Sequence, residues 1–161
     1  KNDLVSELVS EYQRVLLGKI GRDRFDSLDA ILRSIHGIAL DLERNRRWAE
    51  AIAHLYFQPD VAPEIHRNLY AISLRHFDMS IEIVLKRPDV RQTALHKILR
   101  HQFANTGYAL VHDLAMGRID GPELGQQLGV ALEVSLAALA RSAGIAIPVF
   151  HAETDSQGEG R

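Results

Sequence analysis

A chain of 161 residues, of which 46% are hydrophobic and 25% charged, has the length and composition of one globular domain. Its formal net charge of −2 argues against nucleic-acid binding by this chain on its own, because phosphate binding normally requires a basic face. The lack of cysteine excludes disulfides, thiolate metal sites and a cysteine nucleophile. No uncharged apolar run approaches the roughly 18 residues of a membrane span, and the chain does not open like a signal peptide, so we expect a cytoplasmic protein with no membrane partner.

Three helices are predicted in the N-terminal half. Apolar residues recur at three- and four-residue spacing over residues 4–16, which predicts a helix that begins almost at the first residue. We therefore expect further residues to precede Lys1 in the full protein. Asp26 or Ser27 can cap a second helix, whose apolar face runs through residues 28–42. After a charged turn, residues 48–57 form a short helix that is rich in aromatic side chains.

The C-terminal half is predicted to contain longer helices and a tail. Residues 64–86 are apolar on more than one side, which is typical of a central helix. Two long helices follow within residues 89–141, joined by the loop 117–122. Residues 145–161 are expected to form an extended, partly disordered tail. Because no segment shows the alternation of a half-buried strand, we predict one all-α domain, residues 1–144, with about six helices.

Both long helices carry rows of small residues that predict close packing. The first combines a stripe of larger residues (Leu99, Phe103, Thr106, Leu110 and Leu114) with a stripe of smaller ones (Ala104, Gly107, Val111 and Ala115). In the second, Gly121, Gly125 and Gly129 lie four apart on one face, and a glycine inside a helix costs roughly 1 kcal/mol relative to alanine. The expected compensation is the close approach of another element, including one from a second copy of the chain.

The sequence offers little for catalysis or metal binding. It lacks the motifs of zinc hydrolases, nucleophile elbows, phosphate-binding loops and dinucleotide sites. Glu50 and His54 are four apart and can face each other on a helix, but a surface contact is a simpler interpretation than a metal site. The doublet His112-Asp113 is interpreted as a polar pair on the outer side of a helix. We therefore predict no catalytic residue, no metal site and no cofactor, in a protein that is not an enzyme.

Histidines and aromatic residues of the middle helices are candidates for a small-molecule pocket. His36, His76 and His101 fall near apolar stripes, where a core or interface histidine is commoner than a ligand contact. Ser73 and Thr106 interrupt otherwise apolar rows, as the few polar groups of a pocket would. The predicted ligand-binding residues are His36, Trp48, Ile52, Leu55, Leu69, Ser73, Phe77, Phe103, Thr106 and Leu110.

Two stretches resemble the TetR/AcrR family of transcriptional repressors. The run Lys1-Asn2-Asp3-Leu4-Val5 resembles the start of the helix that follows the recognition helix in that family. A later stretch of the chain also resembles the C-terminal half of proteins of that family. It comprises Gly107, Leu110 and Leu114, then residues 117–120, and then a last helix with Leu124, Leu128 and Leu132. The resemblance runs from the first residue to about residue 141 and rests on helix order and a loose motif. The helix-turn-helix of the family would precede the sequence.

The resemblance implies the regulatory domain of a ligand-responsive repressor. It implies a homodimer, because in that family the last two long helices pair with their copies in a four-helix bundle. It also implies a pocket between the central helices for a small, mostly apolar effector, whose binding alters the separation of the two DNA-reading heads. Operator DNA would be bound only through the missing N-terminal domain. The implied dimer-interface residues are Ala104, Gly107, Val111, Ala115, Gly125, Gly129, Leu132 and Leu136.

Two other interpretations are left open by the residues alone. One is a helical dimer that binds a small molecule or has a structural role and carries no DNA-binding head. The other is a helical enzyme. The sequence upstream of Lys1 would distinguish the repressor from the dimer without a DNA-binding head. Roughly 45 upstream residues with a helix-turn-helix pattern and a net positive charge would favour the repressor. Loss of turnover on substitution of Glu50 or His54 would favour the enzyme.

Overall fold

The structure, a computed structural model, describes residues 25–57 and 63–146 together with Glu7, Glu11, Tyr12 and Arg14. Six side chains between residues 64 and 73 are not described: Glu64, Ile65, Asn68, Leu69, Ile72 and Ser73. All secondary structure in the described part of the chain is helical, which confirms the predicted all-α fold. The predicted helix 4–16 lies mostly outside the described residues, as does the predicted tail from residue 147 onwards.

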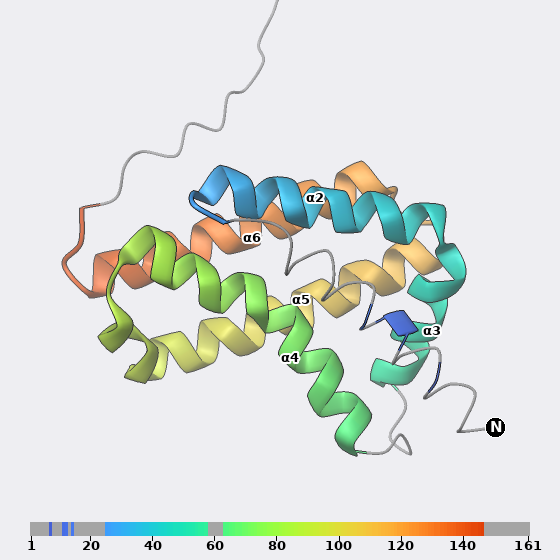
Figure 1. Cartoon of the computed structure of the whole chain (residues 1–161), viewed down its shortest axis with the longest axis horizontal. Coiled ribbons are helices and arrows are strands. Elements are labelled where there is room, and N and C mark those ends of the chain that lie inside the picture. The colour runs from blue at the N-terminus through green and yellow to red at the C-terminus, as the bar shows by residue number, and fades with distance from the viewer. Residues whose placement is uncertain (1–6, 8–10, 13, 15–24, 58–62, 147–161) are drawn as a thin grey trace, which may run out of the picture.

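Five α-helices and two shorter helical segments follow one another in the described chain (Figure 1). They are α2 (Leu28–Arg44), α3 (Arg46–Phe57), α4 (Pro63–Ser80), the π-helix η1 (Ile81–Leu85), the 3-10 helix η2 (Pro88–Gln92), α5 (Ala94–Ala115) and α6 (Gly121–Ser142). The predicted order of helices is therefore confirmed over this part. None of the described helices combines the length and the apolar character that crossing a membrane requires.

Capping side chains set the start of α2 and of α6. The Ser27 hydroxyl accepts a hydrogen bond from the backbone N–H of Ala30 at 3.2 Å, so the serine of the two predicted candidates is the cap. The Asp120 carboxylate accepts the backbone N–H of Glu123 at 2.8 Å. Each cap satisfies a donor that the first turn of a helix leaves without an intrahelical partner.

The first long helix begins at Ala94, and the predicted start at residue 89 is wrong. Thr93 has an extended backbone, and its hydroxyl accepts the backbone N–H of His96 at 3.1 Å. Because an N-cap residue is not itself helical, it separates α5 from the preceding 3-10 turn. The apolar periodicity runs across this break, so it did not reveal the boundary.

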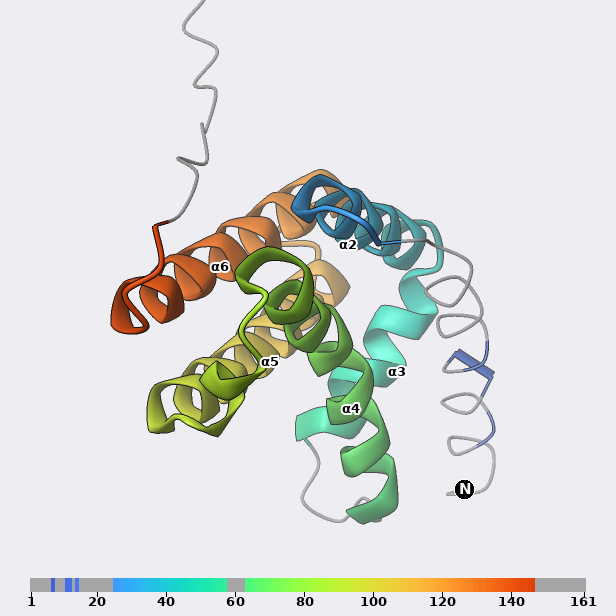
Figure 2. The same ribbon diagram turned by 60° about the vertical axis from the view of Figure 1, so that its left-hand side comes forward.

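The helices form two groups joined by α5. Figure 2 shows α2 and α6 side by side, with α3 and α4 on the other side of the molecule. α2 packs along α6, α3 packs along α5, and α5 also contacts α4 and α6. The long helix α5 is therefore central, and α4, which contacts α2, α3 and α5, also agrees with the central position predicted for the helix over residues 64–86.

The glycine row of α6 faces α2 of the same chain. A Cβ atom on Gly125 would lie 3.1 Å from the Cα of His36, and one on Gly129 would lie 3.3 Å from a terminal methyl of Leu32. Glu43 similarly covers Gly121. The predicted close approach is confirmed, and the element that approaches is a helix of this chain.

Two hydrophobic clusters lie at the two ends of the molecule's interior. The first joins α2, α3, α5 and α6 and includes Ala39, Leu42, Ala49, Ile52, Leu55, Tyr108, Leu110, Val111, Leu114 and Leu124. The second joins α2, α4, η1, α5 and α6 and includes Leu28, Ile31, Ile35, Phe77, Ile81, Phe103, Leu132, Leu136 and Leu139. The space between α3, α4 and α5 lies beside these clusters.

Candidate functional site

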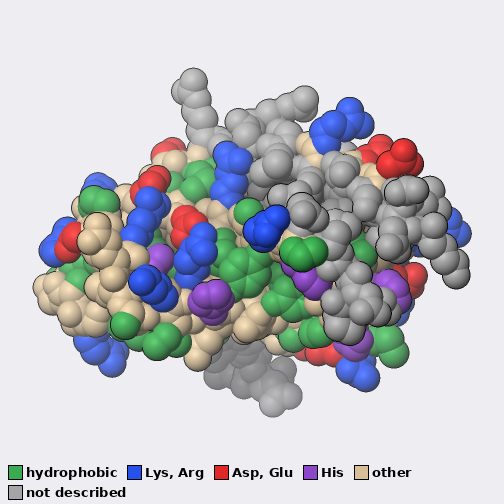
Figure 3. All heavy atoms as spheres, turned by 90° about the horizontal axis from the view of Figure 1, so that it is seen from below, with side chains coloured by type: hydrophobic (Ala, Val, Ile, Leu, Met, Phe, Trp, Pro, Cys, Tyr) green, Lys and Arg blue, Asp and Glu red, His purple; other side chains and the backbone are tan. Residues whose placement is uncertain are grey.

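A cavity of about 660 Å³ lies among α3, α4 and α5, within the size range of small-molecule sites. Its described lining consists of Tyr56 from α3, of His66, Arg67, Tyr70, Ala71 and Leu74 from α4, and of Arg100 from α5. In the view of Figure 3, histidine and basic side chains lie among apolar ones on the surface. The lining combines aromatic, basic and apolar groups, which can orient a ligand as well as bury it.

Tyr56 is held rigidly at the wall between α3 and α5. Its ring stacks on Tyr108 with the centroids 3.7 Å apart and the planes 11° from parallel. Its hydroxyl donates a hydrogen bond to Oδ1 of Asn105 at 2.5 Å. Burial raises the pKa of Tyr56, so the phenol is neutral at physiological pH. One face of the ring is covered by Tyr108, and the ring also makes an edge-to-face contact with Phe57, so it is held from more than one side.

Tyr70 is held in the same way on the opposite wall. Its hydroxyl is hydrogen-bonded to Nδ1 of His101, which lies one helical turn before Asn105 on α5. The pKa of Tyr70 is raised mainly by burial and further by Tyr56, while Arg100 lowers it. The two phenols and the guanidinium therefore lie within electrostatic reach of one another.

His66 connects α4 to the end of α3. Its Nε2 donates a hydrogen bond to the backbone carbonyl of Leu55 at 2.9 Å, which assigns the proton to that nitrogen because a carbonyl only accepts. The edge of the imidazole also meets the ring of Tyr56, with the centroids 6.3 Å apart. The cavity walls are thus positioned by contacts between three helices.

Arg100 carries a positive charge at the α5 side of the cavity. Its Nε and Nη2 donate to the two carboxylate oxygens of Asp78 at 2.9 and 2.8 Å. This bidentate pair fixes the plane of the guanidinium. Arg67, exposed on α4, adds a second positive charge to the lining, and the described lining residues include no carboxylate.

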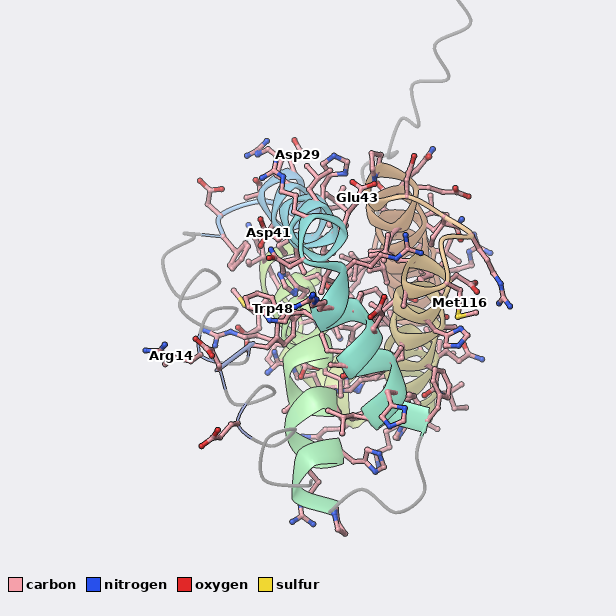
Figure 4. All side chains as sticks on the ribbon, turned by 90° about the vertical axis from the view of Figure 1, so that its right-hand side faces the viewer. Arg14, Asp29, Asp41, Glu43, Trp48 and Met116 are labelled. Atoms are coloured by element: carbon pink, nitrogen blue, oxygen red, sulfur yellow. The ribbon has the colours of Figure 1, made fainter. Side chains whose placement is uncertain are left out.

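The predicted ligand-binding residues lie elsewhere where their side chains are described. Five of them are buried in the two clusters: Ile52, Leu55, Phe77, Phe103 and Leu110. Trp48 is half-buried, and its ring meets that of Tyr12 edge-on at 5.5 Å (Figure 4). His36 is exposed beside Gly125, and Thr106 is exposed. The side chains of Leu69 and Ser73 are outside the described set. The carbonyl of Leu55 accepts a hydrogen bond from His66 of the cavity wall.

The predicted dimer-interface residues are covered within the chain. Ala104, Leu132 and Leu136 are fully buried, and a Cβ atom on Gly107 would lie 3.5 Å from Leu128 of α6. The others are buried or half-buried: Val111, Ala115, Gly125 and Gly129. A stripe of small residues predicts a close neighbour but does not say which molecule supplies it.

The basic and phenolic groups of the cavity were missed by sequence reasoning. Arg67 and Arg100 have the charge that is typical of solvated helix faces, and an aromatic residue such as Tyr70 within an apolar helix is more often part of the core. One signal was present, because His66, Tyr70 and Leu74 repeat every four residues and form a row of mixed character. Such a row is neither a plain core stripe nor a plain solvent face.

A second, smaller hollow of about 370 Å³ lies between α3 and α5, lined by Ala53, His54, Phe57 and His112. His54 and Glu50 are both exposed on α3. Asp113, the neighbour of His112 in the chain, accepts a hydrogen bond from Arg118 at 2.9 Å. Its carboxylate is therefore already paired with a cation of this chain. Among the described residues, no group of three or more histidine or acidic side chains is arranged to hold a metal ion.

His96 forms a buried polar cluster where α4 meets the start of α5. Only 5% of it is exposed, and neither ring nitrogen makes a hydrogen bond among the described residues. Its Nε2 lies 3.9 Å from the Asp78 carboxylate, which is already held by Arg100. Burial lowers the pKa of His96; Asp78 raises it by a smaller amount, and Arg100 and Arg91 also lower it. The imidazole is therefore neutral at physiological pH.

In comparisons with known protein families, curated proteins and solved structures, none matches this chain.

Proposed function

We propose that this chain is the effector-binding and dimerisation domain of a ligand-responsive, DNA-binding repressor that acts in the cytoplasm. The observation that carries the proposal is the cavity, whose Tyr56 and His66 are held by hydrogen bonds between helices. Preorganised polar groups in a hollow of this size are typical of small-molecule sites. The all-helical fold with two long C-terminal helices agrees with the resemblance to the TetR/AcrR family.

The dimer is proposed to form through the outer faces of α5 and α6. Val130 and Val134 lie one turn apart on α6 and are 51% and 62% exposed, and Ile98 on α5 is 54% exposed. Met116, at the turn after α5, is 59% exposed and points outward (Figure 4). Exposed apolar side chains on neighbouring helices are typical of an interface. We propose this surface in place of the dimer interface predicted from the sequence, because the residues of that predicted interface are covered within the chain.

Effector binding acts on DNA affinity by linkage. The effector changes the equilibrium between two separations of the DNA-reading heads only by its different affinity for the two states. α5 carries part of the cavity wall and, on its outer face, part of the proposed interface. A shift of α3 or α4 against α5 therefore reaches the partner copy through α5.

Sedimentation at micromolar concentration tests the dimer, and the expected result is a dimer for the unchanged chain. Val134→Lys should give monomers, because it places a charge inside the interface. Phe57→Lys is the matched control, since Phe57 is 56% exposed but lies on α3. A monomeric unchanged chain would refute the dimer, and equal behaviour of the two variants would refute this face.

Native mass spectrometry tests the effector, and the expected result is a small molecule that co-purifies with the chain or saturates it.

The coding sequence upstream of Lys1 tests the DNA-binding head. A coding sequence without a helix-turn-helix there would refute the repressor and favour a headless ligand-binding dimer.

A further inference from the structure

We propose that mild acidification shifts the corner at which α4 meets η2 and the first turn of α5 towards an open state, through protonation of the buried imidazole of His96. The corner comprises residues 86–97 and lies at one end of the molecule (Figure 1). This switch goes beyond the proposed function, since it requires neither an effector nor DNA. Two features carry it: the surroundings of the imidazole and the few contacts that hold η2.

The imidazole of His96 is buried where it cannot be solvated as a cation. Only 5% of the residue is exposed, and neither ring nitrogen makes a hydrogen bond among the described residues. The ring of Phe77 lies against it, with the centroids 5.8 Å apart. A buried neutral imidazole loses hydrogen bonds to water, whereas a buried imidazolium loses the solvation of a full charge, which costs far more. Protonation therefore favours a state in which the ring reaches water.

The charged groups around His96 do not compensate a positive charge on it. Oδ1 of Asp78 on α4 lies 3.9 Å from Nε2 of the ring, but both carboxylate oxygens already accept hydrogen bonds from Arg100 of α5, at 2.9 and 2.8 Å. The other neighbouring cation is Arg91 of η2, which is bound to Glu82 of η1 at 2.6 Å. Burial is the main cause that lowers the pKa of His96, and the two guanidiniums lower it further. Asp78 and the backbone carbonyl of Arg91 raise this pKa, but they offset the lowering only in part.

Few contacts hold η2 to the rest of the molecule. Among residues 86–94, all of which are described, only Val90 is buried, and Arg91 is half-buried. Nη2 of Arg91 donates to the backbone carbonyl of Asp78 at 2.8 Å and to Oε1 of Glu82 at 2.6 Å. A segment with so little buried surface can open locally at a free energy below that of global unfolding.

The cap of α5 joins η2 to His96. The hydroxyl of Thr93 donates to the carbonyl of Val90 at 2.8 Å and accepts the backbone N–H of His96 at 3.1 Å. The imidazole and η2 therefore share one hydrogen-bonded turn, and we expect them to leave α4 together. Because the open ring has an ordinary pKa, each proton that it binds below about pH 6.5 favours the open state over the closed one.

Hydrogen–deuterium exchange of the 161-residue chain, followed by NMR at about pH 7.5 and about pH 5.5, tests the opening. The reporters are the backbone N–H groups of Thr93, His96 and Lys97, which are hydrogen-bonded within the corner. Protection factors are compared, which removes the direct effect of pH on the chemical exchange rate. We expect up to about tenfold less protection at the lower pH, because the lowered pKa of His96 adds a factor of about ten for each pH unit below about 6.5.

The same experiment separates local opening from global unfolding. The corner reporters should be less protected than the N–H groups in the middle of α6 at both pH values. Low concentrations of urea should change their protection little, since a local opening exposes little surface. Equal protection and equal urea dependence of the corner and α6 would refute the local opening.

Two variants connect the effect to His96. His96→Leu removes the group that binds the proton and keeps an apolar side chain beside Phe77, so the protection of the corner should no longer depend on pH. His54→Gln is the matched control, because His54 is exposed on α3 outside the corner, and this variant should retain the full loss of protection. An equal loss in His96→Leu and in the unchanged chain would overturn the switch.

The ring signals of His96 in the unchanged chain provide a test that does not depend on whether His96→Leu folds. Followed by NMR against pH, they should titrate with a midpoint below about 6.5. A midpoint at or above that value would refute the switch, as would corner protection that does not change with pH. None of these outcomes bears on the dimer or on the cavity, which sedimentation and native mass spectrometry test separately.

Discussion

Replacing Gly125 by alanine tests the close contact between α6 and α2. The new Cβ atom would lie 2.7 Å from Nδ1 of His36 and 3.1 Å from its Cα. The exposed imidazole can rotate away, but the Cα moves only if α2 moves. Overpacking of this kind costs about 1–3 kcal/mol, and the helix gains about 1 kcal/mol when alanine replaces glycine. The expected net loss in the free energy of unfolding is therefore about 0–2 kcal/mol.

Gly37→Ala is the matched control for this effect. Gly37 lies inside α2, is exposed, and would place its Cβ within 4 Å of nothing, so about 0.5–1 kcal/mol of stabilisation is expected. The difference between the two variants removes the helix-propensity gain that they share. It should equal the packing cost of about 1–3 kcal/mol, or roughly 2–12 °C in Tm. Gly129→Ala should lie between them, because the flexible end of Leu32 is its nearest neighbour, at 3.3 Å.

Urea unfolding followed by circular dichroism measures all three variants. Protein concentration must be held constant, because association would make the apparent stability depend on it. If Gly125→Ala stabilises the chain as much as Gly37→Ala, the close packing of α2 on α6 is refuted. Sedimentation should be unchanged by Gly125→Ala in the folded state, since this glycine lies inside the chain.

Two further predictions concern polar groups. Because burial holds the pKa of His96 below its usual 6.5, the unfolded chain takes up a proton that the folded chain does not, so stability is complete above about pH 6.5 and falls as the pH drops below it. His96→Leu should flatten this fall by up to about 1.4 kcal/mol per pH unit, and an unchanged slope in urea unfolding between pH 7 and 5 would contradict the argument. Asp120→Ala removes the cap that accepts the Glu123 N–H and should lower the free energy of unfolding by about 1 kcal/mol, with Asp120→Asn as the variant that retains most of it.

The helical architecture was predictable because its signals are local. Apolar residues at helical spacing, capping side chains and breaking glycines or prolines act over a few neighbouring positions. Ser27 and the turn before Asp120 were found in this way. The start of α5 was missed because the helical spacing of apolar residues continues back to Val90, which lies in η2 and is 2% exposed. Periodicity therefore reports burial, and burial continues across a change of helix type.

The cavity was not predictable from the same signals. Phe77 and Phe103 were expected to line it, yet their rings pack on each other with centroids 5.4 Å apart in the core. An apolar side chain has the same sequence signature whether it faces a filled core or a hollow. Arg67 and Arg100 come from helices that meet only after folding, and a charged residue on a helix normally indicates solvent. Their convergence is a property of the crossing of α4 and α5.

By itself, the sequence determined that this chain is helical, where most helices run, and that α6 needs a close neighbour along its glycine row. It did not determine which element is the neighbour, because glycine specifies only the absence of a side chain. Tertiary structure assigned that place to α2, since Ala39 and the backbone at His36 fill the space beside Gly125. It also left Val130 and Val134 uncovered and brought Arg67 and Arg100 to one cavity. These are outcomes of how whole helices cross, which depends on packing between segments far apart in the chain and not on any local pattern.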